Sequence, residues 1–307
     1  MFDTIVMKAS YVSIAFENWN SLKPVIKTFL DEEMRLRRRS FVLHDEKIPY
    51  INYQEWSQSL IVQVSIPKFL YGNNVKLLQE KDIIVFFQRL HERLFELFGV
   101  PLRPEDWYLY HNRLDVCWNF AVVGQIDDYL NRLSRLQISF KKTVVTGYLE
   151  TVAFKNKSSQ IIFYNKQKEV IHKKESKEII EQADGLLRME IRPSHHDWTK
   201  FSRRKRVIDL LKIDVFTEIT RKVMKQIIFP NEPDGINLAW LKSQSYKISQ
   251  IETVLGFQVL HQKLPEGVLK QFYTAATYAN RKNLVKGIPL PRKQEKLELH
   301  IDYAKLG

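Results

Sequence analysis

Three short segments of the sequence bring together acidic, basic and phenolic side chains of kinds that can act on phosphate esters. Residues 113–120, 161–166 and 187–192 read as β-strands, in which successive side chains point to opposite faces. Their polar faces hold Asp115 with Arg113, Cys117 and Asn119, then Tyr164 with Lys166, and then Arg188 with Glu190 and Arg192. If the strands share one sheet, whose apolar face packs on helices, these side chains gather on its open face.

The chemistry expected of such a face is cleavage of a phosphodiester. Two carboxylates, Asp115 and Glu190, can hold a hard cation such as Mg²⁺ or Mn²⁺ through oxygen ligands. The cation would polarise a phosphate and offset the charge that develops on its oxygens. A tyrosine hydroxyl is a poor nucleophile at its free pKa of about 10, but a nearby cation and Lys166 favour its phenolate. Attack by Tyr164 on phosphorus would form a phosphotyrosine ester that can later be reversed.

Each of these residues also has a structural interpretation. The outer face of a half-buried strand commonly carries solvated charges, so Asp115 and Glu190 are also consistent with surface carboxylates. Tyr164 is one of 13 tyrosines in the chain, and most tyrosines serve packing. Spacing alone therefore leaves both interpretations open.

The elements that must position these residues follow from hydrophobic periodicity. Apolar residues at three- and four-residue spacing predict helices over 82–98 and 125–136. Alternation over 60–66 predicts a half-buried strand. Further strands are expected at 3–14, 113–121, 143–154, 160–166 and 186–192.

The pattern changes near residue 200, where strand signals fade and basic helical periodicity begins. We therefore expect two domains, a catalytic one over residues 1–200 and a mostly helical, basic DNA-binding or accessory one over residues 201–307. The first is predicted to be α+β, with a mainly antiparallel sheet of about five or more strands backed by helices.

The composition indicates what kind of partner the protein binds and in which cellular compartment it works. The 307 residues include 48 Lys and Arg against 35 Asp and Glu, a net charge of +13, and 44% are apolar. This charge favours a polyanionic partner, with nucleic acid first and an anionic membrane second.

The single cysteine, Cys117, excludes an intramolecular disulfide and a Cys-rich zinc site. The first ten residues lack a signal-peptide core, and no uncharged stretch reaches 18 apolar residues, so a soluble cytoplasmic protein is expected.

Five segments, in order along the chain, are similar to motifs of one protein family. They are Met1-Phe2-Asp3-Thr4-Ile5-Val6, the segment from Ser65 to Asn74 that ends in Gly72-Asn73-Asn74, Arg113-Leu114-Asp115, Tyr164-Asn165-Lys166-Gln167-Lys168-Glu169, and Gly185-Leu186-Leu187-Arg188-Met189-Glu190. The chain thereby resembles, over about residues 1–200, the phage and plasmid replication initiators of the gene II/X type, the family of the filamentous-phage gene II protein.

The resemblance implies a rolling-circle replication initiator with the fold of the rolling-circle nucleases. Such an enzyme works in a bacterial host and nicks one strand of the origin. It becomes linked through tyrosine to the 5′ phosphate and leaves a 3′-OH for the host polymerase. It later rejoins the displaced strand. The family's linked tyrosine corresponds to Tyr164, with Lys166 assisting and Arg188 contacting the phosphate. Asp115 and Glu190 correspond to metal ligands, and Glu150 is a third candidate. The implied partners are origin DNA, as duplex and single strand, a host helicase and polymerase, and a second copy of the chain on DNA.

One feature departs from many rolling-circle initiators and relaxases, which bind metal through a His-hydrophobic-His motif. None of the eight histidines forms a His-x-His pair, so a bound Mg²⁺ or Mn²⁺ would depend mainly on carboxylates. His195 and His196 are adjacent, in a segment expected to be a loop, and adjacent side chains on a strand could not share a metal. Beyond residue 200 the chain is also shorter than the filamentous-phage protein.

Origin recognition requires basic surfaces, and two runs are candidates: Arg35, Arg37, Arg38 and Arg39, and Arg203, Arg204, Lys205 and Arg206. Such residues neutralise backbone phosphates, although a solvated helix face explains each run as well. Tyr148, Phe163 and Trp198 could stack on bases or pack in the core. The C-terminal helices could grip duplex flanks, and a helix-turn-helix there has no definite position from sequence.

Other functions remain open at this stage. A conjugative or mobilisation relaxase has the same chemistry and a different target. A non-catalytic DNA-binding regulator could use the same scaffold, although the presence of the N-terminal strands and Tyr164 argues against it. A membrane-surface protein would need a large basic amphipathic helix, and the sequence shows none.

Overall fold

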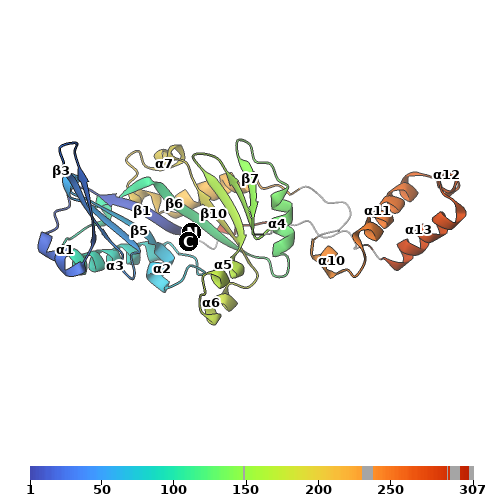
Figure 1. Cartoon of the computed structure of the whole chain (residues 1–307), viewed down its shortest axis with the longest axis horizontal. Helices are drawn as coiled ribbons and strands as arrows, with labels where there is room; N and C mark the ends of the chain where they lie inside the picture. The colour runs from blue at the N-terminus through green and yellow to red at the C-terminus, as the bar shows by residue number, and fades with distance from the viewer. Residues whose placement is uncertain (148, 230–237, 289, 291–297, 304–307) are drawn as a thin grey trace. The chain divides into compact units, whose positions relative to one another are not determined.

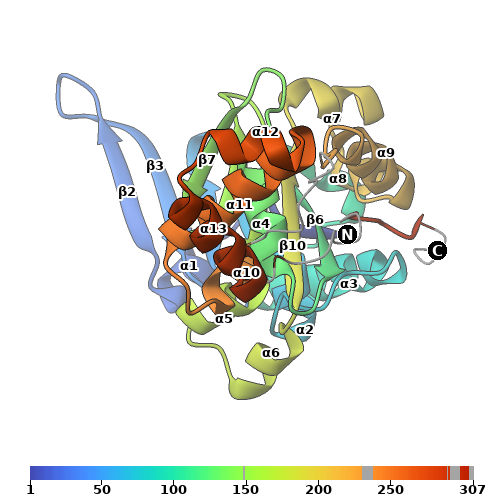
Figure 2. The ribbon, with the colours of Figure 1, turned by 90° about the vertical axis from the view of Figure 1, so that its right-hand side faces the viewer.

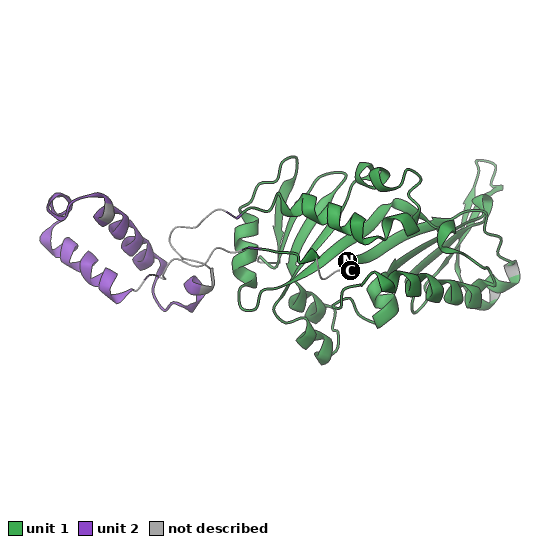
Figure 3. Ribbon diagram, turned by 180° about the vertical axis from the view of Figure 1, so that it is seen from behind, with its two compact units in different colours: residues 1–228, 299–307 green, residues 229–298 purple. Residues whose placement is uncertain are grey.

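The computed structural model describes residues 1–307 apart from 148, 230–237, 289, 291–297 and 304–307 (Figure 1). The chain forms two compact units, shown in different colours in Figure 3. Unit 1 comprises residues 1–228 and 299–307, and unit 2 comprises residues 229–298.

Unit 1 is built on one large antiparallel sheet. The described residues contribute ten strands in the order β2-β3-β4-β5-β1-β6-β10-β9-β8-β7. The strands are β1 (Phe2–Ala9), β2 (Val25–Leu30), β3 (Leu36–Leu43), β4 (Tyr50–Gln54), β5 (Ser59–Ser65), β6 (Tyr108–Ala121), β7 (Lys142–Thr146), β8 (Thr151–Lys155), β9 (Gln160–Asn165) and β10 (Leu186–Arg192). Strands distant in sequence therefore meet at β1, β6 and β10 (Figure 1).

The helices of unit 1 are α1 (Phe16–Leu22), α2 (Ile66–Tyr71), α3 (Lys81–Phe98), α4 (Ile126–Ser134), α5 (Lys166–His172), α6 (Lys177–Gln182), α7 (His195–Phe201), α8 (Val207–Leu210) and α9 (Ile213–Met224). Unit 2 contains α10 (Leu238–Ser243), α11 (Ile248–Lys263), α12 (Glu266–Gln271) and α13 (Ala275–Gly287). Among the described residues, no helix is both long and apolar enough to cross a membrane.

Aromatic side chains fasten helices to one face of the sheet. Trp19 of α1 stacks on Phe41 of β3, with ring centroids 5.1 Å apart, and also contacts Phe98 of α3. Phe216 of α9 packs edge-on against Phe2 of β1, with centroids 6.3 Å apart. Burial of such large rings supplies much of the driving force for folding. The alternate side chains of the strands lie on the opposite face, where the polar residues gather.

The sequence-based expectations for unit 1 are largely confirmed. The fold is α+β with a mainly antiparallel sheet, and the expected helices at 82–98 and 125–136 are α3 and α4. The long helix α3 ends at Gly99, whose φ of 68° suits a residue without a side chain. The segment expected as one strand over 143–154 is instead the hairpin of β7 and β8. Strands β2, β3 and β4 have no counterpart in the predicted elements.

The boundary expected at residue 200 lies later, between residues 228 and 229. Helices α8 and α9 belong to unit 1 because α9 buries Val215, Phe216 and Ile219 in its core. The change to helical, basic sequence near residue 200 therefore marks a change of element type within one unit. Unit 2 is helical in its described part, as expected for the C-terminal region.

A partly buried carboxylate, Asp197, joins α7 to α9 through Lys222 and predicts how stability depends on pH. Burial alone would raise the pKa of Asp197, but hydrogen bonds from Lys222 and Ser194 outweigh it and lower the pKa to about 2. Since the ordinary pKa is 3.8, the ionised form stabilises the fold above about pH 4, and this contribution is lost as the pH falls through 2. Asp197→Asn should lower the free energy of unfolding at neutral pH by about 1 to 2 kcal/mol. Urea unfolding of both proteins should show the difference shrinking between pH 4 and 2, and a difference independent of pH would contradict this account.

Candidate active site

Tyr164 and Glu190 lie on neighbouring strands and form the centre of the site. Strand β9 pairs with β10 so that Tyr164 is opposite Arg188, and Glu190 is the next residue on that face. The Tyr164 hydroxyl donates a hydrogen bond to Glu190 Oε1 at 2.6 Å. Burial, together with the negative charge of Glu190, raises the pKa of Tyr164 well above its usual value of 10. The phenol is therefore protonated at rest, with a carboxylate placed to accept its proton.

Arg188 holds the strands beneath this pair together. Its side chain is fully buried, and a buried guanidinium is tolerated only when its donors are satisfied. Nη2 donates to Asp3 Oδ2 at 2.5 Å, and Nε donates to Glu190 Oε1 at 3.1 Å. Nη1 donates to the Asn74 carbonyl at 2.7 Å and to Asn119 Oδ1 at 3.3 Å. Arg188 thus orients Glu190, and it has no exposed surface with which to contact a phosphate, contrary to the role expected of it.

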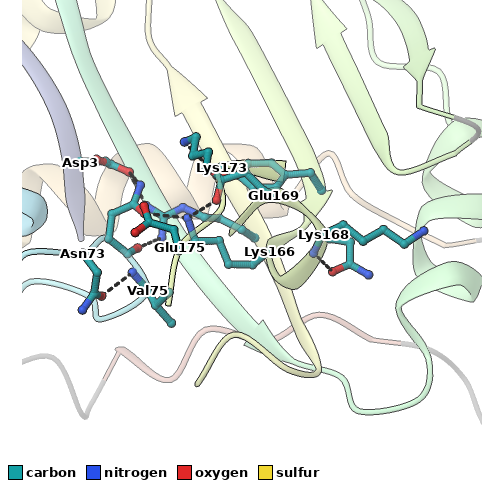
Figure 4. Close-up of polar contacts among 12 residues, drawn as sticks. Asp3, Asn73, Val75, Lys166, Lys168, Glu169, Lys173 and Glu175 are labelled. Carbon is teal, nitrogen blue, oxygen red and sulfur yellow. Dashed lines mark hydrogen bonds and ion pairs between the residues drawn. The ribbon is translucent and has the colours of Figure 1, made fainter. Parts of the chain in front are cut away.

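Lys166 reaches the same cluster from a helix rather than from a strand. Strand β9 ends at Asn165, whose side chain accepts a hydrogen bond from the Lys168 amide and caps α5. Lys166 is therefore the first residue of α5, and the expectation that it continues the strand face of Tyr164 is wrong. Its ammonium is buried and donates to Asn74 Oδ1 at 2.8 Å and to Glu169 Oε2 at 2.7 Å (Figure 4). Burial lowers the pKa of Lys166.

Asp3 completes the buried network. It accepts hydrogen bonds from Ser65 at 2.6 Å and from the Asn74 amide at 3.1 Å, in addition to the bond from Arg188. Burial alone would raise the pKa of Asp3, but the charge of Arg188 and these hydrogen bonds lower it. Asp3 is therefore an ionised partner for Arg188 in the interior.

A pocket of about 450 Å³ opens beside this network. Its lining includes the carboxylates of Glu150, Glu169 and Glu190, together with Tyr164 and His172. Oxygen-rich donors of this kind are the ligands preferred by Mg²⁺ and Mn²⁺. The donor types therefore fit a hard divalent cation, although among the described residues no group of three or more His, Cys, Asp or Glu side chains lies close enough to hold one.

Two of the pocket carboxylates already form ion pairs with cationic side chains of the protein. Glu150 lies 3.0 Å from Lys168 Nζ and 3.5 Å from His172 Nε2, and the hydrogen bond from Lys168 lowers the pKa of Glu150. Glu169 is held by Lys166 and Lys173. Binding of a divalent cation would require at least one of these carboxylates to exchange its partner.

Asp115 does not line this pocket, although it lies on the expected face of β6. It is buried and accepts two hydrogen bonds from Arg192, at 2.7 and 3.1 Å. Of the three residues expected to hold metal, the structure thus brings Glu150 and Glu190 into one pocket with Tyr164, and it places Asp115 in a separate ion pair.

Three residues that sequence reasoning did not assign belong to the site: Asp3, Asn74 and Glu169. Each lies in one of the five segments that carry the family resemblance, so the signal was present in the quoted motifs. What the sequence could not show is that Arg188 and Lys166 join these segments by direct hydrogen bonds.

The two basic runs lie apart in the fold. The first occupies the hairpin of β2 and β3, which reaches out past the neighbouring strands (Figure 2). In this hairpin Arg37 and Arg38 are exposed, Arg38 lies over the Trp56 ring, and Arg39 pairs with Glu55. The second run follows α7 in a turn, where Arg203 and Arg204 are exposed. His195 and His196, expected in a loop, begin α7 after a Ser194 cap.

The aromatic residues expected to stack on bases are buried or undescribed. Phe163 and Trp198 have no exposed surface and pack in the core. Tyr148 lies outside the described residues. On the polar face of the sheet, the rings of Tyr50 and Tyr110 are half-buried and keep access to solvent.

A comparison with protein-family models finds none that matches this chain, and a comparison with curated proteins finds no match. The assignment of a function therefore rests on the five segments and on the geometry that joins them.

Proposed function

We propose that this protein is a rolling-circle replication initiator, a metal-dependent enzyme that nicks and rejoins one strand of origin DNA through Tyr164. One observation carries the proposal. The five segments that resemble the gene II/X initiators are dispersed over about the first 190 residues. In the fold, four of them lie on the neighbouring strands β1, β6, β10 and β9. The remaining segment directly follows β5, which pairs with the other side of β1. Four of the five segments are joined directly by the hydrogen bonds of Arg188 and Lys166.

The proposed reaction is a transesterification at phosphorus. A lone pair of the Tyr164 oxygen attacks the scissile phosphate, and the bond from phosphorus to the 3′ oxygen breaks. The phenolic proton passes to Glu190, which already accepts a hydrogen bond from this hydroxyl at 2.6 Å. The leaving 3′ oxygen takes up a proton from solvent, so the products are a 5′-phosphotyrosine and a free 3′-OH. The reverse attack by a 3′-OH rejoins the strand.

The network beneath this pair serves to position it. Arg188 and Lys166 are fully buried, so in the proposal they act through Glu190, Asp3 and Glu169 and do not touch the DNA. Lys168 and Lys173, which line the pocket and are exposed over about half their side chains (42% and 50%), are better placed to contact the phosphate.

The proposal retains Mg²⁺ or Mn²⁺ as a cofactor, held by Glu150 and Glu190. Bound there, the cation would withdraw charge from the phosphate oxygens and favour the phenolate of Tyr164. Asp115 is not part of this set, because Arg192 occupies its carboxylate.

The partners follow from the same proposal. Origin DNA is the substrate, bound as duplex and as a melted strand, and the net charge of +13 suits it. Arg37 and Arg38 on the β2–β3 hairpin and Arg203 and Arg204 after α7 would contact backbone phosphates. A host helicase and polymerase would act on the nicked product, and two copies of the chain would meet at the origin in the cytoplasm of a bacterial host.

The test is detection and mapping of the covalent adduct. The full chain is incubated with Mn²⁺ and with supercoiled plasmids that carry fragments of the DNA flanking its own gene. Adducts are then digested, and the modified peptide is identified by mass spectrometry. The proposal expects nicked plasmid and a nucleotide on Tyr164. An adduct on another tyrosine would support the nicking activity but show that Tyr164 is not the nucleophile. Binding without cleavage of any plasmid would favour the non-catalytic regulator.

A further inference from the structure

Unit 2 contains a short helix, a turn of three residues and a longer helix in succession. Helix α12 (Glu266–Gln271) is followed by three turn residues and then by α13 (Ala275–Gly287). Two helices joined by three or four residues define the helix-turn-helix motif, and its second helix enters the major groove of DNA. In Figure 1, α12 crosses the end of the pair formed by α11 and α13. From the sequence alone this motif had no definite position.

Side-chain contacts hold α12 against α11 and α13. Phe257 of α11, Leu269 of α12 and Tyr278 of α13 form one buried cluster, with the Phe257 and Tyr278 rings 5.5 Å apart. Glu266, at the start of α12, accepts hydrogen bonds from Tyr278 at 3.1 Å and from Lys282 at 2.9 Å. Thr274 caps α13 by accepting a hydrogen bond from the Thr277 amide. The three helices thus pack around one shared apolar cluster.

The outer face of α13 carries small and amide side chains. Tyr278 faces the core, and the residues on the opposite side of the helix are exposed, among them Ala276, Asn280 and Asn283. Spacings of four and three residues place these three on one stripe. Asparagine pairs with adenine through two hydrogen bonds in the major groove, and alanine contacts the thymine methyl group. Small residues at the start of a recognition helix also let its backbone approach the base pairs closely.

The charge around this stripe suits a DNA backbone. Residues 247–288 contain six lysines and arginines against two glutamates, a net charge of +4. On α13 itself, the exposed Lys286 lies three residues after Asn283 and extends the stripe. A cation in this position can contact a phosphate at the edge of a major groove about 12 Å wide. The polar, basic character of the stripe argues against an apolar protein partner.

We infer that α12 and α13 form a helix-turn-helix that reads duplex DNA in the major groove, with Asn280 and Asn283 contacting base edges. This inference deepens the proposed function, since it names the element that would recognise the origin duplex. The nicking site lies in unit 1, so the two proposals can fail separately.

The test measures base preference by the full chain. The protein is mixed with a library of random-sequence duplexes, and the bound fraction is sequenced. The parent protein should enrich a motif that contains adenine. Asn280→Ala/Asn283→Ala should lower that enrichment by about tenfold or more, while affinity for unselected duplexes stays within about threefold. Both residues are exposed, so circular dichroism should show an unchanged fold.

Lys286→Ala provides the matched control on the same helix. Removing this ammonium, which would contact a phosphate, should weaken binding of all sequences alike and leave the motif unchanged. An unchanged motif in the double asparagine variant would overturn the inference, as would a parent protein that enriches no duplex motif or that prefers single-stranded RNA. If the motif depends on Asn280 and Asn283 but no DNA is ever cleaved, the helix-turn-helix stands and the proposed nicking activity falls.

Discussion

Tyr164→Phe should abolish formation of the covalent DNA adduct and lower the rate of strand cleavage by about 10³-fold or more. The substitution removes the one oxygen that would attack phosphorus, and loss of a nucleophile has effects of at least this size in other covalent enzymes. The fold should be retained, since the ring stays in place and only the hydrogen bond to Glu190 is lost. Such a loss costs about 1 kcal/mol.

The control for Tyr164→Phe is the same substitution at a tyrosine that lies on the same face of the sheet but takes no part in the proposed chemistry. Tyr110 of β6 is half-buried on that face and lies beneath Lys8, away from the pocket of Glu150 and Glu190. Tyr110→Phe should cleave a single-stranded origin oligonucleotide at the parental rate. Cleavage and adduct formation are followed together on denaturing gels with Mn²⁺ present. A Tyr164→Phe protein that still forms the adduct would show that another tyrosine is the nucleophile.

The proposed proton transfer also predicts the pH dependence of adduct formation. Burial and the charge of Glu190 raise the pKa of Tyr164, so the resting phenol keeps its proton at neutral and mildly alkaline pH. Because this proton passes to Glu190 within the site, the rate in single-turnover experiments should stay level over that range. A rate that rises in proportion to hydroxide would show that the proton leaves to solvent instead.

Arg188→Met is expected to have the largest effect on stability, a loss of about 3 to 5 kcal/mol in the free energy of unfolding. The guanidinium is fully buried and makes four hydrogen bonds. Methionine fills a similar volume but leaves Asp3 as a buried carboxylate without its charged partner. Urea unfolding at neutral pH measures the loss.

Two further variants test whether the loss of stability comes from the buried network or from removal of any arginine. Arg206→Met removes an arginine whose ion pair with Asp209 is partly exposed, and it should cost no more than about 1 kcal/mol. Asp3→Asn combined with Arg188→Met should recover part of the stability, because the unpaired carboxylate is gone. The free energy of unfolding of Asp3→Asn alone gives the cost of that change in the parent protein. If the double variant is less stable than Arg188→Met by this same amount, the two side chains are not coupled.

Local periodicity was sufficient to predict much of unit 1. The alternation of Leu187, Met189 and Ile191 with Arg188 and Glu190 placed the polar pair on one face of β10, as the structure shows. The spacing within 82–98 identified α3, since a helix buries one stripe of its surface wherever it packs. These features depend only on neighbours in the chain.

The site itself depended on contacts that no local pattern encodes. Lys166 turns into the interior because the Asn165 cap ends β9 and begins α5. Asp115 pairs with Arg192, and Glu150 with Lys168, because the strand register and the approach of α5 decide which charges meet.

The sequence by itself therefore determined the class of fold, the strands that carry Tyr164 and Glu190, and the polar face that these two residues share. Only the tertiary structure decided that Asp3, Asn74 and Glu169 join them and that Asp115 does not line their pocket. The physical reason is that backbone periodicity is set within a few residues. The pairing of buried charges, in contrast, is set by desolvation, which selects partners from anywhere along the chain.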